Sequence, residues 1–156
     1  MILSEQPDSK EAHSIAFREV TQSDIPWLVA LRMATMDEHH RAAGRALSAE
    51  DHRSRVLYDF AAIQIVLRDG RDIGMIKVQR TSSTWRLVQI QLLPEHQNQG
   101  IGRQILVGLL ADAKSHGAAI ELNVLKNNRA RELYGRLGFR VVAEKGRAVV
   151  MRVDPQ

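Results

Sequence analysis

The chain of 156 residues contains no cysteine. Disulfides, thiolate metal ligands and a cysteine nucleophile are therefore excluded, so any chemistry uses oxygen and nitrogen groups. Aromatic residues are also scarce, with three Phe, two Tyr and two Trp. The net charge is +4, but the basic residues are scattered and few rings are available to stack on bases. These features favour an anionic small ligand over nucleic acid.

Long hydrophobic runs are absent as well. No stretch approaches the roughly 20 apolar residues that span a bilayer. The opening MILSEQPDSKEAHS lacks the basic start and apolar middle of a signal peptide, so we expect a cytoplasmic protein without a membrane partner. The hydrophobic content of 44% is enough to fill one core. The expected organisation is a flexible polar tail over 1–14 and a single domain over 15–156.

Hydrophobic periods of two and of about 3.6 residues divide the chain into elements. Strands are expected at 14–20, 61–67, 72–80, 85–92, 118–124, 139–143 and 148–153. Helices are expected at 21–36, 48–60, 101–117 and 130–137. The pair Ser48 and Asp51 suits a capping box, and Asp69-Gly70 is typical of a hairpin turn. Strands thus dominate the first half of the chain, and strand-helix units dominate the second.

Hydrophobic and polar residues alternate in the strand WRLVQIQL. Val88, Ile90 and Leu92 are expected on one face, and Gln89 and Gln91 on the other. The strand ends in LLPE and leads directly into a loop.

That loop, HQNQGIGRQ, places Gly100 and Gly102 at the start of a helix. The first N–H groups of a helix lack internal acceptors and carry the positive end of its dipole. Glycines let a ligand approach these groups closely, so the loop predicts a phosphate site or, more simply, a tight turn. No Walker A sequence GxxxxGK is present, and Ile105 occupies the third glycine position of the dinucleotide-binding GxGxxG. A phosphate held here belongs to another kind of ligand.

A second motif, LNVLKNNRARELYGRLGF, follows about thirty residues later. The loop fits (Q/R)xxGxG at Gln97, Gly100 and Gly102. The second motif fits NxxAxxLYxxxGF at Asn127, Ala130, Leu133, Tyr134, Gly138 and Phe139. Together they resemble the GCN5-related N-acetyltransferase (GNAT) superfamily, whose members transfer the acetyl group of acetyl-CoA to an amine. The order of elements fits that superfamily over about 15–153, and the diagnostic residues lie within 88–139.

The resemblance implies an α/β (α+β) fold with a mixed, mostly antiparallel central sheet of about six or seven strands and about four flanking helices. It also implies acetyl-CoA as cosubstrate and an amine acceptor. The loop then holds the pyrophosphate, the backbone at the end of the preceding strand lines the thioester arm where that strand splays from its neighbour, and Asn127 contacts the pantetheine arm or caps its helix. The implied acetyl-CoA-binding residues are Gln91, Leu92, Gln97, Asn98, Gln99, Gly100, Ile101, Gly102, Arg103 and Asn127.

By the same resemblance, Tyr134 protonates the departing thiolate as general acid. A purely structural alternative exists, because Tyr134 shares an apolar stripe with Ala130 and Leu137, and a core tyrosine with a satisfied hydroxyl has the same sequence pattern.

The general base is where the chain departs from its relatives, several of which carry glutamate where this chain has Asn123. Glu121 lies on the same strand face two residues earlier and is the candidate base. Glu38, His39 and His40 are alternatives from the first helix. Structural roles fit all of them, and no histidine pair has the HxxxH spacing of a metal site, so no metal is expected.

The acceptor is expected to meet the segment from Arg32 to Phe60. Asp37 and Glu38 would attract a cationic amine, whereas Arg32 and Arg41 would suit a carboxylate-bearing one. We expect direct transfer in a ternary complex, with a non-catalytic acetyl-CoA sensor as the alternative. The two C-terminal strands, FRVVA and AVVMRV, are also able to pair across a homodimer.

Overall fold

The computed structural model describes residues 14–42 and 47–155, with the side chains of 37–42 left out. The predicted tail over 1–14 thus falls outside the described residues except for Ser14. The seven strands form one sheet in the order β1-β2-β3-β4-β5-β7-β6. They are β1 (Ile15–Glu19), β2 (Ile63–Arg68), β3 (Arg71–Arg80), β4 (Thr84–Leu92), β5 (Ala119–Leu125), β6 (Arg140–Lys145) and β7 (Ala148–Val153).

Neighbouring strands are antiparallel except for β4 and β5, which run parallel. The helix α3 connects this parallel pair, as such a crossover requires. The α-helices are α1 (Ile25–Ala42), α2 (Ala49–Leu57), α3 (Ile101–Ser115) and α4 (Ala130–Arg136). The predicted mixed, mostly antiparallel sheet with four helices is therefore confirmed.

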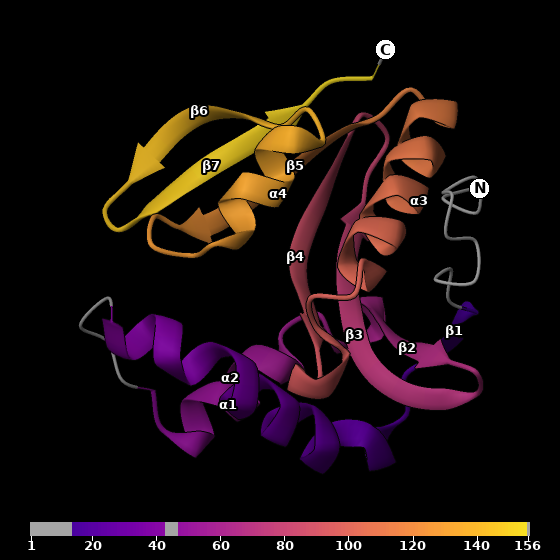
Figure 1. The fold of residues 1–156 in the computed structure, drawn as a ribbon, viewed down its shortest axis with the longest axis vertical. Coiled ribbons are helices and arrows are strands. Elements are labelled where there is room, and N and C mark those ends of the chain that lie inside the picture. The colour runs from indigo at the N-terminus through magenta and orange to yellow at the C-terminus, as the bar shows by residue number, and fades with distance from the viewer. Residues whose placement is uncertain (1–13, 43–46, 156) are drawn as a thin grey trace.

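Two hydrophobic cores lie on opposite faces of the sheet. The larger core joins β3, β4, β5 and β7 to α3 and α4 through residues such as Ile105, Leu122 and Phe139. The smaller core joins β2 and β3 to α1 and α2 through Leu28 and Val56. Figure 1 shows α1 and α2 grouped below the sheet, and α3 and α4 packed along it.

The ends of the helices follow their predicted local signals. The capping box before α2 is present, with the Ser48 side chain accepting from the backbone N–H of Asp51 at 3.1 Å. Gly117 and Gly138 take left-handed backbone conformations after α3 and α4, with φ of 68° and 103°. The helix α1 runs further than the predicted 21–36, through the polar segment to Ala42.

Candidate functional site

The sheet opens between β4 and β5. Their paired residues run from Thr84 with Ala119 to Leu87 with Leu122 and stop there. At this point β4 carries a bulge, because Leu87 and Gln89 oppose consecutive residues of β3 and leave Val88 without a partner. A bulge bends its strand, so β4 leaves β5 at this point. The expected splay of this strand is present. The alternation of hydrophobic and polar side chains, however, begins after Val88 and not at Val88 as predicted.

The other side of β4 lies unusually close to β3. A Cβ added to Gly74 would lie 2.3 Å from the carbonyl oxygen of Gln91. Glycine is therefore required at this position, because any side chain would displace the part of β4 that borders the opening. Figure 1 shows β3 running alongside β4, and β4 diverging from β5.

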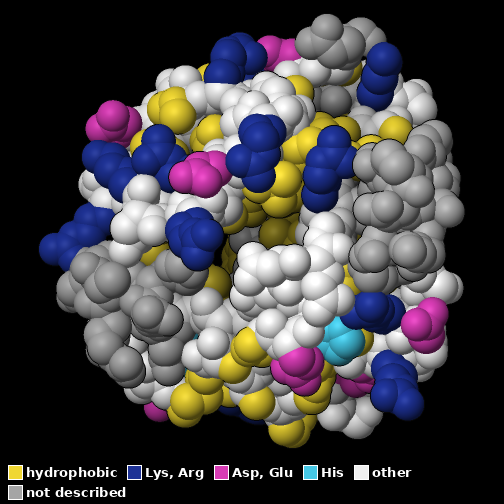
Figure 2. Space-filling view, viewed as in Figure 1, with side chains coloured by type: hydrophobic (Ala, Val, Ile, Leu, Met, Phe, Trp, Pro, Cys, Tyr) yellow, Lys and Arg dark blue, Asp and Glu magenta, His cyan; other side chains and the backbone are white. Residues whose placement is uncertain are grey.

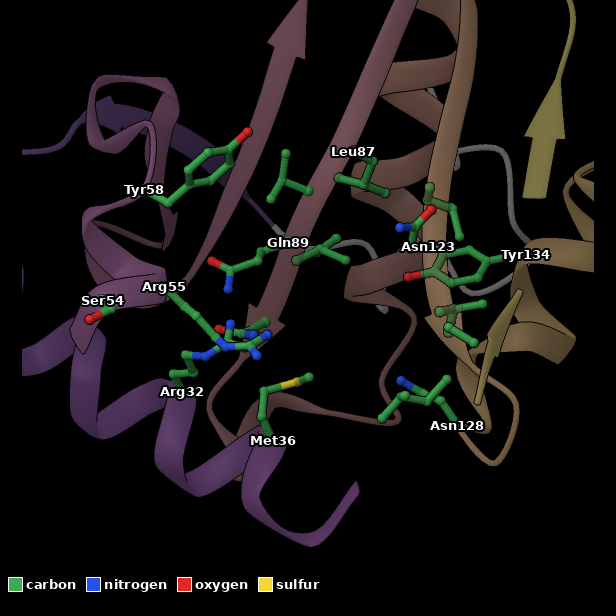
Figure 3. A pocket seen from close by; sticks show the side chains of 17 residues that line it. Arg32, Met36, Ser54, Arg55, Tyr58, Leu87, Gln89, Asn123, Asn128 and Tyr134 are labelled. Atoms are coloured by element: carbon green, nitrogen blue, oxygen red, sulfur yellow. The ribbon is translucent and has the colours of Figure 1, made fainter. Parts of the chain in front are cut away.

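A cavity of about 410 Å³ occupies the opening. It is bordered by β4, β5, the turn before α4, and the helices α1 and α2 (Figure 3). Its lining residues are Arg32, Met36, Ser54, Arg55, Tyr58, Leu87, Val88, Gln89, Ile90, Gln91, Leu122, Asn123, Val124, Leu125, Asn128, Tyr134 and Ala148. In the space-filling view this face is hollowed, with hydrophobic side chains on the floor and several Lys and Arg side chains around it (Figure 2).

Tyr134 belongs both to the core and to the cavity. Its ring packs edge-on against Phe139, with centroids 5.7 Å apart, and the residue is only 8% exposed. Its hydroxyl points into the cavity and has no hydrogen-bond partner among the described residues (Figure 3). Burial raises the pKa of Tyr134 to about 12, so the hydroxyl stays protonated at neutral pH. A core tyrosine with a satisfied hydroxyl, the structural alternative, does not describe this arrangement.

The glycine loop presents the open start of α3. Gly100 has a left-handed φ of 82°, and its carbonyl accepts the N–H of Gln104 at 3.0 Å. Within the described residues, the N–H groups of Ile101, Gly102 and Arg103 have no acceptor. A Cβ on Gly102 would meet nothing within 4 Å, so the space beside this glycine in the first turn is open. This first turn has the donors and dipole that an anion requires.

Gln97 and Gln99 stabilise the conformation of the loop. The Gln97 Nε2 donates to the carbonyl of Leu92 at 3.0 Å, and the Gln99 Nε2 donates to the carbonyl of Glu95 at 2.9 Å. The Arg68 Nη1 of β2 also donates to the Gln99 Oε1 at 2.8 Å. These bonds hold the loop in place before any ligand arrives.

Two of the remaining predicted loop donors face outward. Asn98 takes a left-handed φ of 60°, and both Asn98 and Arg103 are exposed. Their side chains are therefore available to a ligand at the start of α3.

The turn before α4 contains two asparagines, and the sequence pattern points to the first. In the structure, Asn128 lines the cavity, and its Oδ1 accepts the N–H of Ala130 at 2.8 Å. Asn127 is exposed and lies outside the cavity lining. The capping interaction suggested for Asn127 is made by Asn128 instead, because α4 begins at Ala130, as predicted, and an asparagine side chain reaches the backbone N–H two residues ahead.

The candidate base Glu121 is held by an ion pair. The Arg152 Nη1 of β7 donates to the Glu121 Oε2 at 2.7 Å, and Glu121 does not line the cavity. Of the residues that the structure describes, none that lines the cavity is Asp, Glu or His. The side chains of the alternatives Glu38, His39 and His40 lie outside the described residues.

The sequence indicated the segment from Arg32 to Phe60 for the acceptor side, but not which of its side chains line the cavity. Arg55 and Tyr58 line the cavity from the end of α2, and Arg32 lines it from α1. The polar segment before Phe60 carries no motif, so only packing reveals which of its side chains turn inward. Within the described part of the chain, no cluster of His, Asp and Glu is placed to hold a metal, and no helix is long and apolar enough to cross a bilayer.

Comparison with protein families agrees with this geometry. The profile of the acetyltransferase (GNAT) domain matches residues 35–151, which is most of the chain. The chain belongs to the GNAT acetyltransferase family. The match includes both sides of the opening, the glycine loop and Tyr134.

Solved structures of low sequence identity share the acetyltransferase fold. The PaiA N-acetyltransferase of Thermoplasma acidophilum, in complex with coenzyme A, is 19% identical with a TM-score of 0.70, over 90% of this chain and 99% of that one. The ribosomal-protein-S18-alanine N-acetyltransferase of Escherichia coli is 20% identical with a TM-score of 0.67, over 92% and 95% of the two chains. The Salmonella typhimurium protein yncA, solved with its cofactor acetyl-CoA, is 19% identical with a TM-score of 0.59, over 91% and 94%.

Proposed function

We propose that this GNAT acetyltransferase moves the acetyl group of acetyl-CoA directly to the nitrogen of an amine within a ternary complex. The observation that carries the proposal is the hydroxyl of Tyr134, which points into the cavity where β4 and β5 separate and has no hydrogen-bond partner among the described residues. A protonated group in that position is able to give its proton to a leaving thiolate.

The phosphates of acetyl-CoA are assigned to the start of α3. The free N–H groups of Ile101, Gly102 and Arg103 and the helix dipole favour an anion there. The exposed side chains of Asn98 and Arg103 add donors. Gln97, Gln99 and Gly100 keep the loop in the conformation that directs these groups outward. The pantetheine arm then passes the turn that holds Asn127 and Asn128.

The thioester is assigned to the end of β4. Beyond Leu87 the backbone of β4 has no pairing with β5, so groups around Gln91 and Leu92 are free to bind the thioester carbonyl. A backbone N–H there stabilises the negative charge that develops on the carbonyl oxygen. The amine nitrogen forms a bond to the carbonyl carbon, the carbon–sulfur bond breaks, and Tyr134 supplies the proton that sulfur takes.

The amine must lose a proton before or during attack. Because no carboxylate or imidazole of the described residues lines the cavity, we assign this proton to water. The predicted base Glu121 is tested directly by Glu121→Gln. If Glu121 is the base, turnover falls; if it only pairs with Arg152, turnover persists.

The decisive experiment measures free thiol released from acetyl-CoA in the presence of amino acids, amino sugars, polyamines, aminoglycosides and short peptides, together with calorimetry of acetyl-CoA binding. Amine-dependent release and an acetylated amine identified by mass spectrometry support the proposal. Binding of acetyl-CoA without release for any amine, including protein acceptors, would favour the alternative of a non-catalytic acetyl-CoA sensor. The absence of binding would contradict both.

A further inference from the structure

Two arginines line the side of the cavity that faces away from α4. Arg32 comes from α1 and Arg55 from α2, and both border the cavity of about 410 Å³. Figure 3 shows their guanidinium groups next to each other, across the cavity from Tyr134 and Asn128. They therefore lie where an acceptor, rather than the leaving thiolate, would be bound.

Arg32 is buried without a partner. It is only 3% exposed, and its Nε and Nη1 atoms have no hydrogen-bond partner within the part of the chain that the structure describes. Burial and the neighbouring charge of Arg55 lower the pKa of Arg32 to about 10, which still leaves it charged at neutral pH. A buried charge with unpaired donors costs several kcal/mol, so it calls for a partner.

Lys77 is a second buried cation in this part of the fold, and its contacts give it a structural role. Its side chain is fully buried on β3, and its ammonium donates to the carbonyls of Arg55, Val56 and Tyr58 at the end of α2. Those bonds satisfy the ammonium and hold the end of α2 against the sheet. The Nε and Nη1 atoms of Arg32 have no comparable acceptors among the described residues, so contacts of this kind do not account for its burial.

The chemistry of the cavity points to the missing partner. No described residue that lines it is acidic, while both arginines contribute positive charge. Two guanidinium groups side by side present several N–H donors in planes that suit the oxygens of a carboxylate or phosphate. A polyamine or another purely cationic acceptor would be repelled from this wall.

We propose that the acceptor is a small amine that carries an oxyanion, either a carboxylate or a phosphate, and that Arg32 and Arg55 bind this group. The amine end of the acceptor then lies toward the opening between β4 and β5. This inference rests on the proposed acetyltransferase function and specifies its substrate class.

The test compares acceptors that differ only in the oxyanion. Amino acids are paired with their carboxamides, and glucosamine 6-phosphate is paired with glucosamine, in the thiol-release assay. We expect kcat/KM to be at least roughly tenfold higher for the charged member of one pair, as the loss of a charge-assisted hydrogen bond predicts. The pair that responds distinguishes a carboxylate from a phosphate. Equal rates within both pairs, or a preference for the neutral members, would overturn the proposal.

Variants then connect the preference to the arginines. Arg32→Met and Arg55→Gln are expected to raise KM for the charged acceptor roughly 10- to 100-fold, to change KM for the neutral partner much less, and to leave the Kd of acetyl-CoA unchanged. Arg53→Gln is the matched control, because Arg53 is exposed on α2 and does not line the cavity. An unchanged preference in both cavity variants would contradict the assignment.

Binding can be measured even if turnover fails. N-acetylglycine and inorganic phosphate serve as probes, and at least one should raise the unfolding midpoint of the wild-type protein but not that of Arg32→Met. Arg32→Met itself should keep or raise the midpoint without ligand, because it removes a buried charge that has no partner. Absence of thiol release with retained probe binding would contradict the proposed function alone. Absence of any probe effect would contradict the oxyanion site.

Discussion

At the scale of single residues, burial determines the chemistry available to each titratable group. Tyr134, Arg32 and Lys77 are all buried, yet only Lys77 has its polar atoms satisfied by the fold. Tyr134 directs its hydroxyl into the cavity, and Arg32 borders the same space. Buried polar groups that have no hydrogen-bond partner at a cavity are available to bind a ligand, whereas those that are paired stabilise the fold.

Tyr134→Phe tests the general acid. Because the wild-type hydroxyl makes no hydrogen bond among the described residues, we expect the variant to keep its unfolding midpoint. We expect kcat to fall roughly 10²- to 10⁴-fold, with little change in KM for acetyl-CoA, since the lost interaction acts on the leaving group. Steady-state kinetics check this. If Tyr134→Phe turns over at the wild-type rate, Tyr134 is not the general acid and its role is purely structural.

Lys77 should make stability depend on pH. Burial lowers its pKa from 10.5 to about 8 in the folded protein. Between these two values the unfolded state binds more protons, so this group makes the free energy of unfolding rise as pH rises from about 8 to 10.5. Denaturant titrations of wild type and Lys77→Met check this, because their difference isolates the one group. A difference that stays constant or falls over that interval would contradict the prediction.

At the scale of elements, the strand β4 and the helix α3 form one continuous unit. The bulge at Val88 turns β4 away from β5, Gly74 lets β3 follow it closely, and Gln97 joins the end of β4 to the loop. The loop then delivers the open N–H groups at the start of α3. The acyl and phosphate positions are therefore linked by about a dozen consecutive residues.

Gly102→Val tests the phosphate position. A Cβ there would meet no atom within 4 Å apart from the neighbouring backbone of α3, so the fold should tolerate the substitution. It would, however, fill the space in front of the N–H groups of α3, and we expect the Kd of acetyl-CoA to rise at least roughly tenfold. Gly108→Val is the matched control, because Gly108 also lies in α3 with open space around it. If calorimetry gives the same affinity for acetyl-CoA in both variants, the assignment of the phosphate to this loop is wrong.

At the scale of the whole molecule, the sheet consists of two halves joined by a short parallel pairing. One half is β1 to β4, and the other is β5 to β7, with the cavity between them. Because α1 and α2 belong to the first half and α4 to the second, the cavity receives side chains from both. The second half ends in β6, an edge strand whose residues are all exposed.

Of the two C-terminal strands predicted to pair across a homodimer, only β6 is placed to do so, because β7 lies between β5 and β6 in the sheet. Val141 and Val142 are 45% and 44% exposed, and an unpaired edge with apolar side chains favours pairing with another strand. Light scattering should show a dimer, and Val141→Lys with Val142→Lys should convert it to a monomer without lowering the unfolding midpoint. A wild-type monomer at working concentrations would contradict this prediction.

The sequence by itself determined the features that depend on near neighbours. Three such features are the capping box at Ser48, the glycine after each helix in the second half of the chain, and the turn at Gly100. Each involves residues within about four positions of one another, so each can be predicted from the sequence. The two motifs that contain Gly102 and Tyr134 were enough to identify the family.

Only the tertiary structure decided which side chains share the cavity. Arg32 and Arg55 meet because two helices pack on the same face, and the fold of the turn before α4 places Asn128 rather than Asn127 at the cavity. The Glu121 carboxylate lies outside the cavity and pairs with Arg152 of β7, a strand that is remote in sequence but adjacent in the sheet. Burial and ion pairing between remote segments depend on packing in three dimensions, which local sequence periodicity does not record.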